Sequence, residues 1–269
     1  YWRFGLFSLA LWYLLDNVKD FKRNIFFVLL VVFLFLLIDG FIQFVTGYNL
    51  IGNTYYTSDG QRISGMFGDE AILGNYISRI LPVLIALFLS FKKNYRIYSF
   101  TSFFCIIFGG ALILISGERA AFLYYLIFIF VVLVLLTNLK KEKIFLICTM
   151  SLLTLGLLVT ENSVKQRMFL NTLVEIKLGN DFSNYNMIPE AYKPIYSTSV
   201  EIIKDNPIFG IGTKMFREKC NNNKYFFENG CSTHPHNTYL QLLAETGIVG
   251  FVPIFSVFLF ICWIFILHI

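Results

Sequence analysis

The fold of this chain is decided by residues 25–46, which read IFFVLLVVFLFLLIDGFIQFVT. This apolar run has one charged residue, Asp39, and it is long enough to cross a bilayer as a helix, which takes about 20 residues. Further apolar runs predict membrane-spanning helices at 71–91, 97–117, 120–137, 144–160 and 248–268. The first run of the chain, 1–15, is too short to span a bilayer unaided.

The composition supports the same conclusion. Hydrophobic residues make up 57% of the 269 residues and charged residues only 14%, and the mean hydropathy is +0.66. These values predict an all-α protein, a polytopic transmembrane helix bundle with a large helical outer loop. The net charge of +5 does not indicate nucleic-acid binding, because the basic residues cluster in short loops. The chain starts without Met, and we expect a fragment that begins inside a transmembrane helix.

The charge of the connecting loops predicts their side of the membrane. Three short loops each carry three Lys or Arg: 16–24, 92–96 and 138–143. The alternate loops carry one each, Arg62 in 47–70 and Arg119 in 116–119. Cytoplasmic loops are enriched in Lys and Arg, so Arg62 and Arg119 are predicted to face the outside. Parity then puts the long segment 161–237 outside as well.

We therefore expect three regions along the chain. They are a transmembrane bundle with a truncated first helix (1–160), an outer loop or cap (161–237), and a short helix with the last span (238–269). Within the outer loop, residues 164–178 and 196–204 have helical spacing. The stretch Asn206-Pro207-Ile208-Phe209-Gly210-Ile211-Gly212 predicts a break, because Asn-Pro and two glycines have turn chemistry.

The most informative polar segment is residues 231–241, CSTHPHNTYLQ, which contains two of the three histidines of the chain. Pro235 suits the first turn of a helix. This predicts Thr233 or His234 as the N-cap and places His236 in the first helical turn. The positive end of the helix dipole favours a neutral imidazole there, which can accept a proton.

The helix predicted after this segment carries a polar stripe. Asn237, Gln241 and Glu245 recur at four-residue intervals and therefore share one face. Gly247 and Gly250 are predicted to end this short helix and to turn the chain into the last span.

Other interpretations of the histidine segment remain open. His236 could simply cap or pack the loop. Cys220, Cys231, His234 and His236 are possible zinc ligands, but their spacing fits no familiar zinc pattern, and no metal site is expected. In an oxidising compartment Cys220 and Cys231 would more simply form a disulfide. Closing so short a loop contributes about 2–3 kcal/mol and tethers the histidine segment.

Arginines provide the second group of candidate site residues. An arginine at a membrane surface commonly anchors the helix or contacts lipid headgroups. A guanidinium group also suits phosphate oxygens. Because Arg62 and Arg119 share the predicted outer face with the histidines, an anion site is the competing interpretation. Asp39 and Arg79 lie inside predicted spans, and we expect them to pair with each other.

Four segments, in this order, resemble the O-antigen ligase and O-antigen polymerase superfamily. They are Arg62-Ile63-Ser64-Gly65-Met66-Phe67, Ser116-Gly117-Glu118-Arg119 with Leu123, Asn206 to Gly212, and His234 to Gln241 with Glu245 and Gly247. The resemblance covers roughly residues 60–260. It implies a metal-independent, GT-C-like helix bundle with a large periplasmic loop. Members of the superfamily transfer glycans from undecaprenyl diphosphate, ligases to lipid A core and polymerases to another repeat unit.

The resemblance also implies roles for single residues. Arg62 and Arg119 correspond to arginines that hold the carrier diphosphate, and His236 corresponds to the essential histidine. Glu118 stands where Ser is commoner, which leaves the local charge open. Substrate-binding roles are assigned to His234, Asn237, Gln241 and Glu245. Arginines stabilise a departing diphosphate and a histidine activates or orients the acceptor hydroxyl, so no cofactor is expected and one direct displacement inverts the anomeric centre.

We therefore expect a ligase in the bacterial inner membrane with its active site facing the periplasm. Its expected partners are an undecaprenyl-diphosphate-linked glycan donor, a lipid A core acceptor and membrane lipids, without nucleic acid. A polymerase that joins repeat units is the first alternative. A transporter of anionic lipid or glycolipid is the second, although the informative residues cluster at one face and no internal repeat is found.

Overall fold

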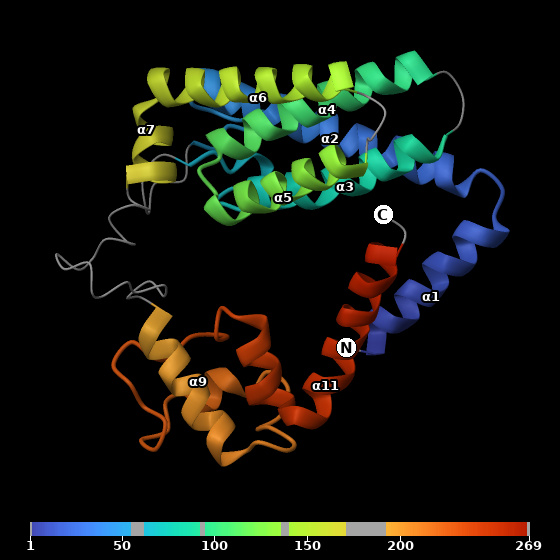
Figure 1. Ribbon diagram of the computed structural model, residues 1–269. Coiled ribbons are helices and arrows are strands. Elements are labelled where there is room, and N and C mark those ends of the chain that lie inside the picture. The colour runs from blue at the N-terminus through green and yellow to red at the C-terminus, as the bar shows by residue number, and fades with distance from the viewer. Residues whose placement is uncertain (1, 55–61, 92–94, 136–139, 171–191, 268–269) are drawn as a thin grey trace. The chain divides into compact units, whose positions relative to one another are not determined.

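The computed structural model describes residues 2–54, 62–91, 95–135, 140–170 and 192–267. In this part of the chain the secondary structure is helical, with no strand and an isolated bridge between Tyr48 and Thr54 (Figure 1). The predicted all-α fold is confirmed. The chain divides into two compact units, Tyr1–Asn171 and Thr172–Ile269, each with a hydrophobic core of its own.

The first unit is a set of apolar helices. Its helices are α1 (Trp2–Asn17), α2 (Phe21–Thr46), α3 (Leu73–Ser90), α4 (Tyr95–Ile115), α5 (Arg119–Leu135), α6 (Lys140–Thr160) and α7 (Asn162–Lys165). A 3₁₀ turn, Gly65–Phe67, precedes α3, and a π-helical turn, Gln166–Leu170, follows α7. The runs predicted to span the membrane coincide with α2 to α6 within a few residues, which confirms these helices.

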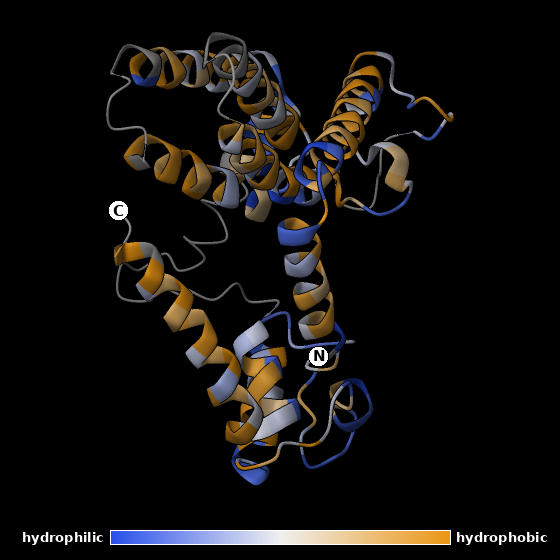
Figure 2. Ribbon diagram, turned by 90° about the vertical axis from the view of Figure 1, so that its right-hand side faces the viewer, coloured by the Kyte–Doolittle hydropathy of each residue, from blue (hydrophilic) through white to orange (hydrophobic). Residues whose placement is uncertain are grey.

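Several helices have the length and composition of membrane spans. Within the described residues four qualify: Phe21–Thr46, Leu73–Ser90, Lys143–Thr160 and Thr238–Ile264. Two shorter apolar helices, Thr101–Ile115 and Arg119–Val134, accompany them. Figure 2 shows that hydrophobic residues dominate these helices, whereas hydrophilic residues gather in the connecting loops. The chain is a membrane protein with several apolar helices.

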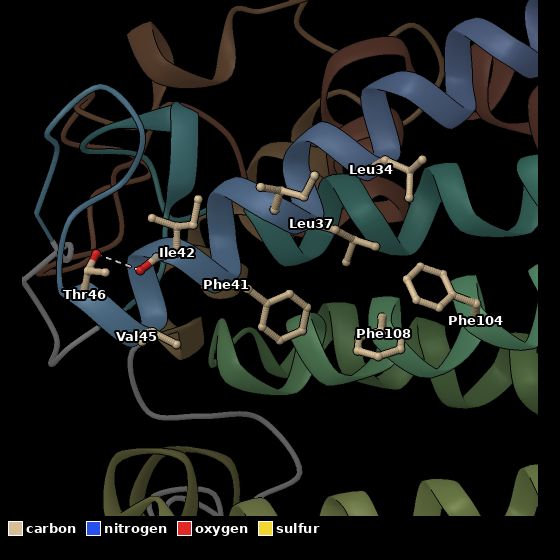
Figure 3. A pocket seen from close by; sticks show the side chains of 9 residues that line it. Leu34, Leu37, Phe41, Ile42, Val45, Thr46, Phe104 and Phe108 are labelled. Atoms are coloured by element: carbon tan, nitrogen blue, oxygen red, sulfur yellow. Dashed lines mark hydrogen bonds between the residues drawn. The ribbon is translucent and has the colours of Figure 1, made fainter.

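An apolar groove of about 550 Å³ lies between α2 and α4 (Figure 3). It is lined by Leu34, Leu37, Ile38, Phe41, Ile42, Val45, Thr46, Phe104 and Phe108. The Thr46 hydroxyl donates to the Ile42 carbonyl oxygen at 2.8 Å, so its hydrogen-bonding capacity is used within α2. This lining suits contact with lipid chains and offers no charged group to a polar substrate.

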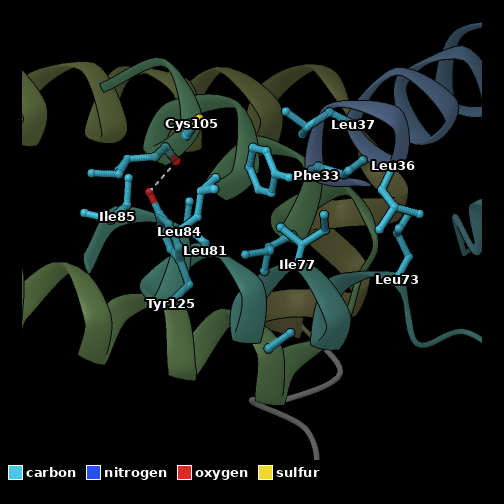
Figure 4. Close-up of a cluster of buried hydrophobic side chains, with 14 of the residues drawn as sticks. Phe33, Leu36, Leu37, Leu73, Ile77, Leu81, Leu84, Ile85, Cys105 and Tyr125 are labelled. Atoms are coloured by element: carbon cyan, nitrogen blue, oxygen red, sulfur yellow. Dashed lines mark hydrogen bonds between the residues drawn. The ribbon is translucent and has the colours of Figure 1, made fainter. Parts of the chain in front are cut away.

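Helix α3 lies at the centre of the first unit, packed against α2, α4 and α5. Its buried face is formed by Leu73, Ile77, Leu81 and Leu84, which Figure 4 shows among Phe33 of α2 and Tyr125 of α5. The Tyr125 hydroxyl donates to the Ile106 carbonyl oxygen at 3.0 Å, the partner that a buried tyrosine requires. The packing of α3 therefore fixes the position of its amino-terminal end, to which polar loops bind.

The second unit contains α9 (Lys193–Asp205), α10 (Phe216–Lys219) and α11 (Thr238–Leu267). Its core is formed by Ile195, Ile202, Phe216, Tyr225 and Ala244. The helix predicted at 196–204 is confirmed by α9. Of the helix predicted at 164–178, the part up to 170 is helical, and the remainder lies outside the described residues.

Helix α11 is interrupted at Gly247, which has φ 61° and ψ −167°. This backbone conformation is essentially restricted to glycine. The interruption separates a short helix, Thr238 to Thr246, from a long apolar helix, Ile248 to Leu267. The predicted helix end at Gly247 is confirmed, and an apolar helix long enough to span a membrane follows it. The part of the prediction that included Gly250 is wrong, because Gly250 lies within that second helix.

Residues 206–212 form a clamp around this interruption. On one side, Ile211 and Gly212 donate their N–H groups at 2.9 Å to the carbonyl oxygens of Ala244 and Glu245. On the other side, the N–H groups of Ile248 and Val249 donate to carbonyl oxygens of the clamp, those of Pro207 and Ile208, at 2.9 and 3.2 Å. Helix ends leave such groups without intrahelical partners. The 206–212 clamp therefore satisfies both ends that the interruption creates.

Candidate active site

Arg62 lies on the loop between α2 and α3. Polar side chains at the end of α2 and within the loop hold this loop in place. The Gln43 side chain accepts the Gly65 N–H at 2.7 Å and donates to the Thr54 carbonyl oxygen at 3.0 Å. Asn49 donates to the Gly65 carbonyl oxygen at 2.8 Å. Gln43 and Asn49 are buried, and buried polar groups need partners. These bonds position the half-buried Arg62 three residues before Gly65.

Asp39 anchors the same loop from inside α2. Its carboxylate is 0% exposed and accepts the Leu50 N–H at 2.9 Å. Arg79 on α3 is exposed. The ion pair predicted between Asp39 and Arg79 is wrong, because the loop that follows α2 folds back and supplies a backbone donor to the buried carboxylate.

Glu118 lies in the turn between α4 and α5 and caps the amino-terminal end of α3. Its carboxylate oxygens accept the N–H groups of Gly74 and Asn75, at 2.5 and 3.1 Å. Burial raises the pKa of the Glu118 carboxyl, while these two amides and the charge of Arg62 act in the opposite direction. A carboxylate at a helix amino terminus is favoured by the dipole. Glu118 thus joins the α4–α5 turn to α3 and contributes negative charge near Arg62.

Arg119 is the first residue of α5 and is paired with a residue that sequence analysis did not single out, Arg167. The Nε of Arg119 donates to the Arg167 carbonyl oxygen at 3.2 Å, and the Nε of Arg167 donates to the Gly117 carbonyl oxygen at 2.9 Å. A Cβ at Gly117 would lie 2.7 Å from Cδ of Arg167. The glycine therefore lets Arg167 approach the α4–α5 turn. The signal in the sequence was weak, a basic residue in the predicted outer segment.

The histidine segment enters α11 differently from the prediction. Helix α11 starts at Thr238, and the Asn237 side chain accepts the N–H groups of Tyr239 and Leu240 at 3.0 and 3.2 Å. This is the geometry of an N-cap. His236 has φ 55°, a left-handed conformation that cannot continue into a helix. The predictions that Thr233 or His234 caps the helix and that His236 lies in its first turn are wrong.

His236 is an exposed imidazole held from several sides. Its Nε2 forms a hydrogen bond of 3.0 Å with the Ser232 hydroxyl. Its ring centroid lies 4.3 Å from that of His234 and 5.6 Å from that of Tyr192. Burial lowers the pKa of His236, and the charge of His234 lowers it further. The neutral form is favoured, as the sequence predicted, although the cause is local packing.

The remaining predicted binding residues take different positions in the second unit. Asn237 is occupied as the N-cap. Gln241 is half-buried one turn further along the helix, and Glu245 is buried at 2% exposure. The His234 Nδ1 bonds to the Thr233 hydroxyl at 2.9 Å, at the surface. Exposure to solvent therefore decreases from the histidines toward Glu245.

A disulfide joins Cys220 to Cys231, with the Cα atoms 5.1 Å apart. It closes the loop that precedes the histidine segment, next to Ser232. Bonded to each other, the two sulfurs do not act as thiolate ligands. Within the described residues, no three or more His, Cys, Asp or Glu side chains are grouped so that they could hold a metal ion.

The candidate residues fall into two groups. The first unit brings Arg62, Glu118, Arg119 and Arg167 to the loops around the amino-terminal ends of α3 and α5. The second unit brings Ser232, His234, His236 and Tyr192 together. The sequence pointed to three members of the first group and two of the second. Arg167, Ser232 and Tyr192 are recognisable only from their contacts.

The sequence model of the O-antigen ligase family matches residues 103–255, more than half of the chain. The matched region includes Arg119, Arg167 and both histidines of the segment, whereas Arg62 precedes it. Among the curated proteins none matches the chain. The chain belongs to the O-antigen ligase family.

Proposed function

We propose that the protein transfers a glycan from an undecaprenyl-diphosphate carrier to a hydroxyl of lipid A core, at the periplasmic face of the bacterial inner membrane. The family acts on lipid-linked glycans. The observation that carries the proposal is the His236 imidazole, which is accessible to solvent and hydrogen-bonded to Ser232. Partial burial by its neighbours lowers its pKa, and His234 lowers it further, so the neutral form is favoured. A base for a sugar hydroxyl needs this combination of accessibility and protonation state.

In the proposed reaction His236 takes the proton of the acceptor hydroxyl or orients that hydroxyl. The acceptor oxygen forms a bond to the anomeric carbon while the bond from that carbon to the diphosphate oxygen breaks, with inversion. The departing diphosphate carries the negative charge, which the guanidinium groups of Arg62 and Arg119 stabilise. Arg167 supports Arg119 through the reciprocal bonds of their Nε groups. This chemistry uses only the chain's own residues.

The first prediction concerns His236 itself. In a transfer assay with the protein in liposomes, a lipid-linked glycan donor and a lipid A core acceptor, His236→Ala should lose activity about 100-fold or more, the usual contribution of a positioned base. His268→Ala, at the third histidine of the chain, is the matched control and should keep full activity. Full activity in His236→Ala would remove the proposed role of this residue.

A polymerase that joins repeat units is the second candidate, because the family match supports either activity. The two differ in the product that accumulates when the gene is deleted. Loss of all glycan from lipid A core indicates the ligase. A core that carries one repeat unit indicates the polymerase. Retention of normal lipid A glycans together with loss of another exported lipid would support a transporter.

A further inference from the structure

Two large apolar side chains lie exposed in the turn of the 206–212 clamp. Ile208 is 55% exposed and Phe209 is 74% exposed. Each costs free energy when left in water, about 25 cal/mol for every Å² of apolar surface. The core of the second unit does not cover them, although it buries Ile195, Ile202 and Phe216 nearby in the sequence. Their exposure therefore calls for a partner.

The hydrogen bonds of the clamp place this turn at a defined end of α11. The N–H groups of Ile248 and Val249 donate to the carbonyl oxygens of Pro207 and Ile208. The turn is thus attached to the amino-terminal end of the long apolar helix. Ile248, Val249 and Val252, in the first turns of that helix, are themselves half exposed. The turn and the helix end expose neighbouring apolar groups.

The polarity of the sequence places the start of this helix relative to a bilayer. Its described part, Ile248 to Leu267, rises about 30 Å at 1.5 Å per residue, which is enough to cross the hydrocarbon core. The apolar run starts at Ile248, directly after Glu245-Thr246-Gly247, so a helix that crosses the membrane has Ile248 at the boundary between headgroups and acyl chains. Ile208 and Phe209, bonded to that end, then lie at the same depth.

We propose that the turn Ile208–Phe209 inserts into the leaflet faced by the second unit and binds lipid acyl chains. Apolar side chains buried at this boundary anchor a protein to the membrane surface. Since the clamp also caps the short helix Thr238 to Thr246, the inserted turn sets the depth of that helix and of the histidine segment that leads into it. The proposal does not depend on the catalytic role of His236.

Phe226 provides a matched comparison in the same unit. It is 58% exposed but lies in the loop closed by the disulfide, which also contains Asn222, Asn223 and Lys224. No hydrogen bond joins this loop to the end of the long apolar helix among the described residues. We therefore expect Phe226 to face water.

Tryptophan fluorescence in bilayers tests the proposal. In a variant with Trp2, Trp12 and Trp263 replaced by Phe, a single tryptophan is introduced as Phe209→Trp or Phe226→Trp. The chain is reconstituted in phosphatidylcholine brominated near the glycerol end of the acyl chains, because bromine quenches tryptophan on contact. Phe209→Trp should lose most of its fluorescence intensity, and Phe226→Trp should retain it.

Ile208→Trp serves as the second variant, in case Phe209→Trp folds poorly, and should be quenched in the same way. Retained fluorescence in both clamp variants would show that another protein segment or water covers the turn. Equal quenching at position 226 would show that contact with lipid is not specific to the clamp. Either result overturns the proposal.

Discussion

At the scale of single residues, the His236 imidazole is surrounded by side chains from two parts of the sequence. Tyr192 packs on the ring, Ser232 bonds to Nε2, and His234 adds a nearby titratable group. His236 precedes Asn237, the N-cap, and therefore lies outside the helix whose dipole the sequence invoked. The lowered pKa instead reflects burial first and His234 second.

A change at Tyr192 tests this account. Tyr192→Ala removes a ring that covers His236, so the pKa of His236 should rise toward its ordinary value of about 6.5. A raised pKa keeps the imidazole protonated to higher pH. The acid limb of the profile of kcat/KM against pH should therefore move to higher pH, whereas Tyr192→Phe, which keeps the ring, should leave it in place. A shift to lower pH in Tyr192→Ala would contradict the account.

Glu118 shows how the tertiary structure assigns a role that the sequence left open. In the sequence, Glu118 before Arg119 left the local charge of the predicted site open. The carboxylate instead accepts two backbone N–H groups at the start of α3. Glu118 therefore joins the α4–α5 turn to the start of α3. The charge of Arg62 acts on the same carboxyl and lowers its pKa.

At the scale of elements, two glycines make the interruption of α11 possible. Gly247 adopts a conformation restricted to glycine, and a Cβ there would collide with the Ile208 carbonyl group. Gly210, at φ 66°, lies against the backbone of Glu245 and Thr246. The segment Asn206 to Gly212 thus has a structural role: its turn and its two glycines allow the clamp to pack closely against α11.

Gly247→Ala should lower the stability of the protein. The unfavourable backbone conformation costs about 1–3 kcal/mol, and the collision with the clamp adds to it. The measurement is the Tm of the detergent-purified protein. Gly156→Ala in α6 is the control, because outside the backbone of its own helix no atom lies within 4 Å of its Cβ position and alanine favours a helix by about 0.5–1 kcal/mol. Equal Tm values for Gly247→Ala and the unchanged protein would refute the role of Gly247.

At the scale of the whole molecule, the proposed reaction needs residues of both units. Arg62, Arg119 and Arg167 belong to the first unit, and His236 belongs to the second. In the proposed reaction the arginines act on the diphosphate and the imidazole acts on the acceptor hydroxyl.

Kinetic coupling tests whether these residues act in the same reaction step. His236→Gln and Arg119→Lys each should reduce kcat/KM, and their combination should reduce it by much less than the product of the two factors, because residues that act as a unit are non-additive. His236→Gln combined with Lys204→Met, on the exposed surface of α9, is the control and should be multiplicative. A multiplicative result for His236 with Arg119 would mean that they act independently.

The sequence by itself determined where this chain forms apolar helices and where α11 breaks. Runs of apolar residues predict membrane spans because each spanning segment must present apolar side chains to lipid and satisfy its own backbone hydrogen bonds as a helix. Both conditions depend on the segment alone. The helices α2 to α6 and the interruption at Gly247 followed from such local patterns. Membership of the O-antigen ligase family was also readable, since its motifs are short and occur in a fixed order.

Only the tertiary structure decided the partners of the polar residues. Asp39 binds a loop amide instead of Arg79, Arg167 joins Arg119, and Tyr192 covers His236. Each contact joins segments separated in the sequence by up to 48 residues. A local pattern reports the propensity and burial of its own segment. It carries no information on which distant donor, acceptor or ring will contact a given side chain. The candidate site is made of such contacts.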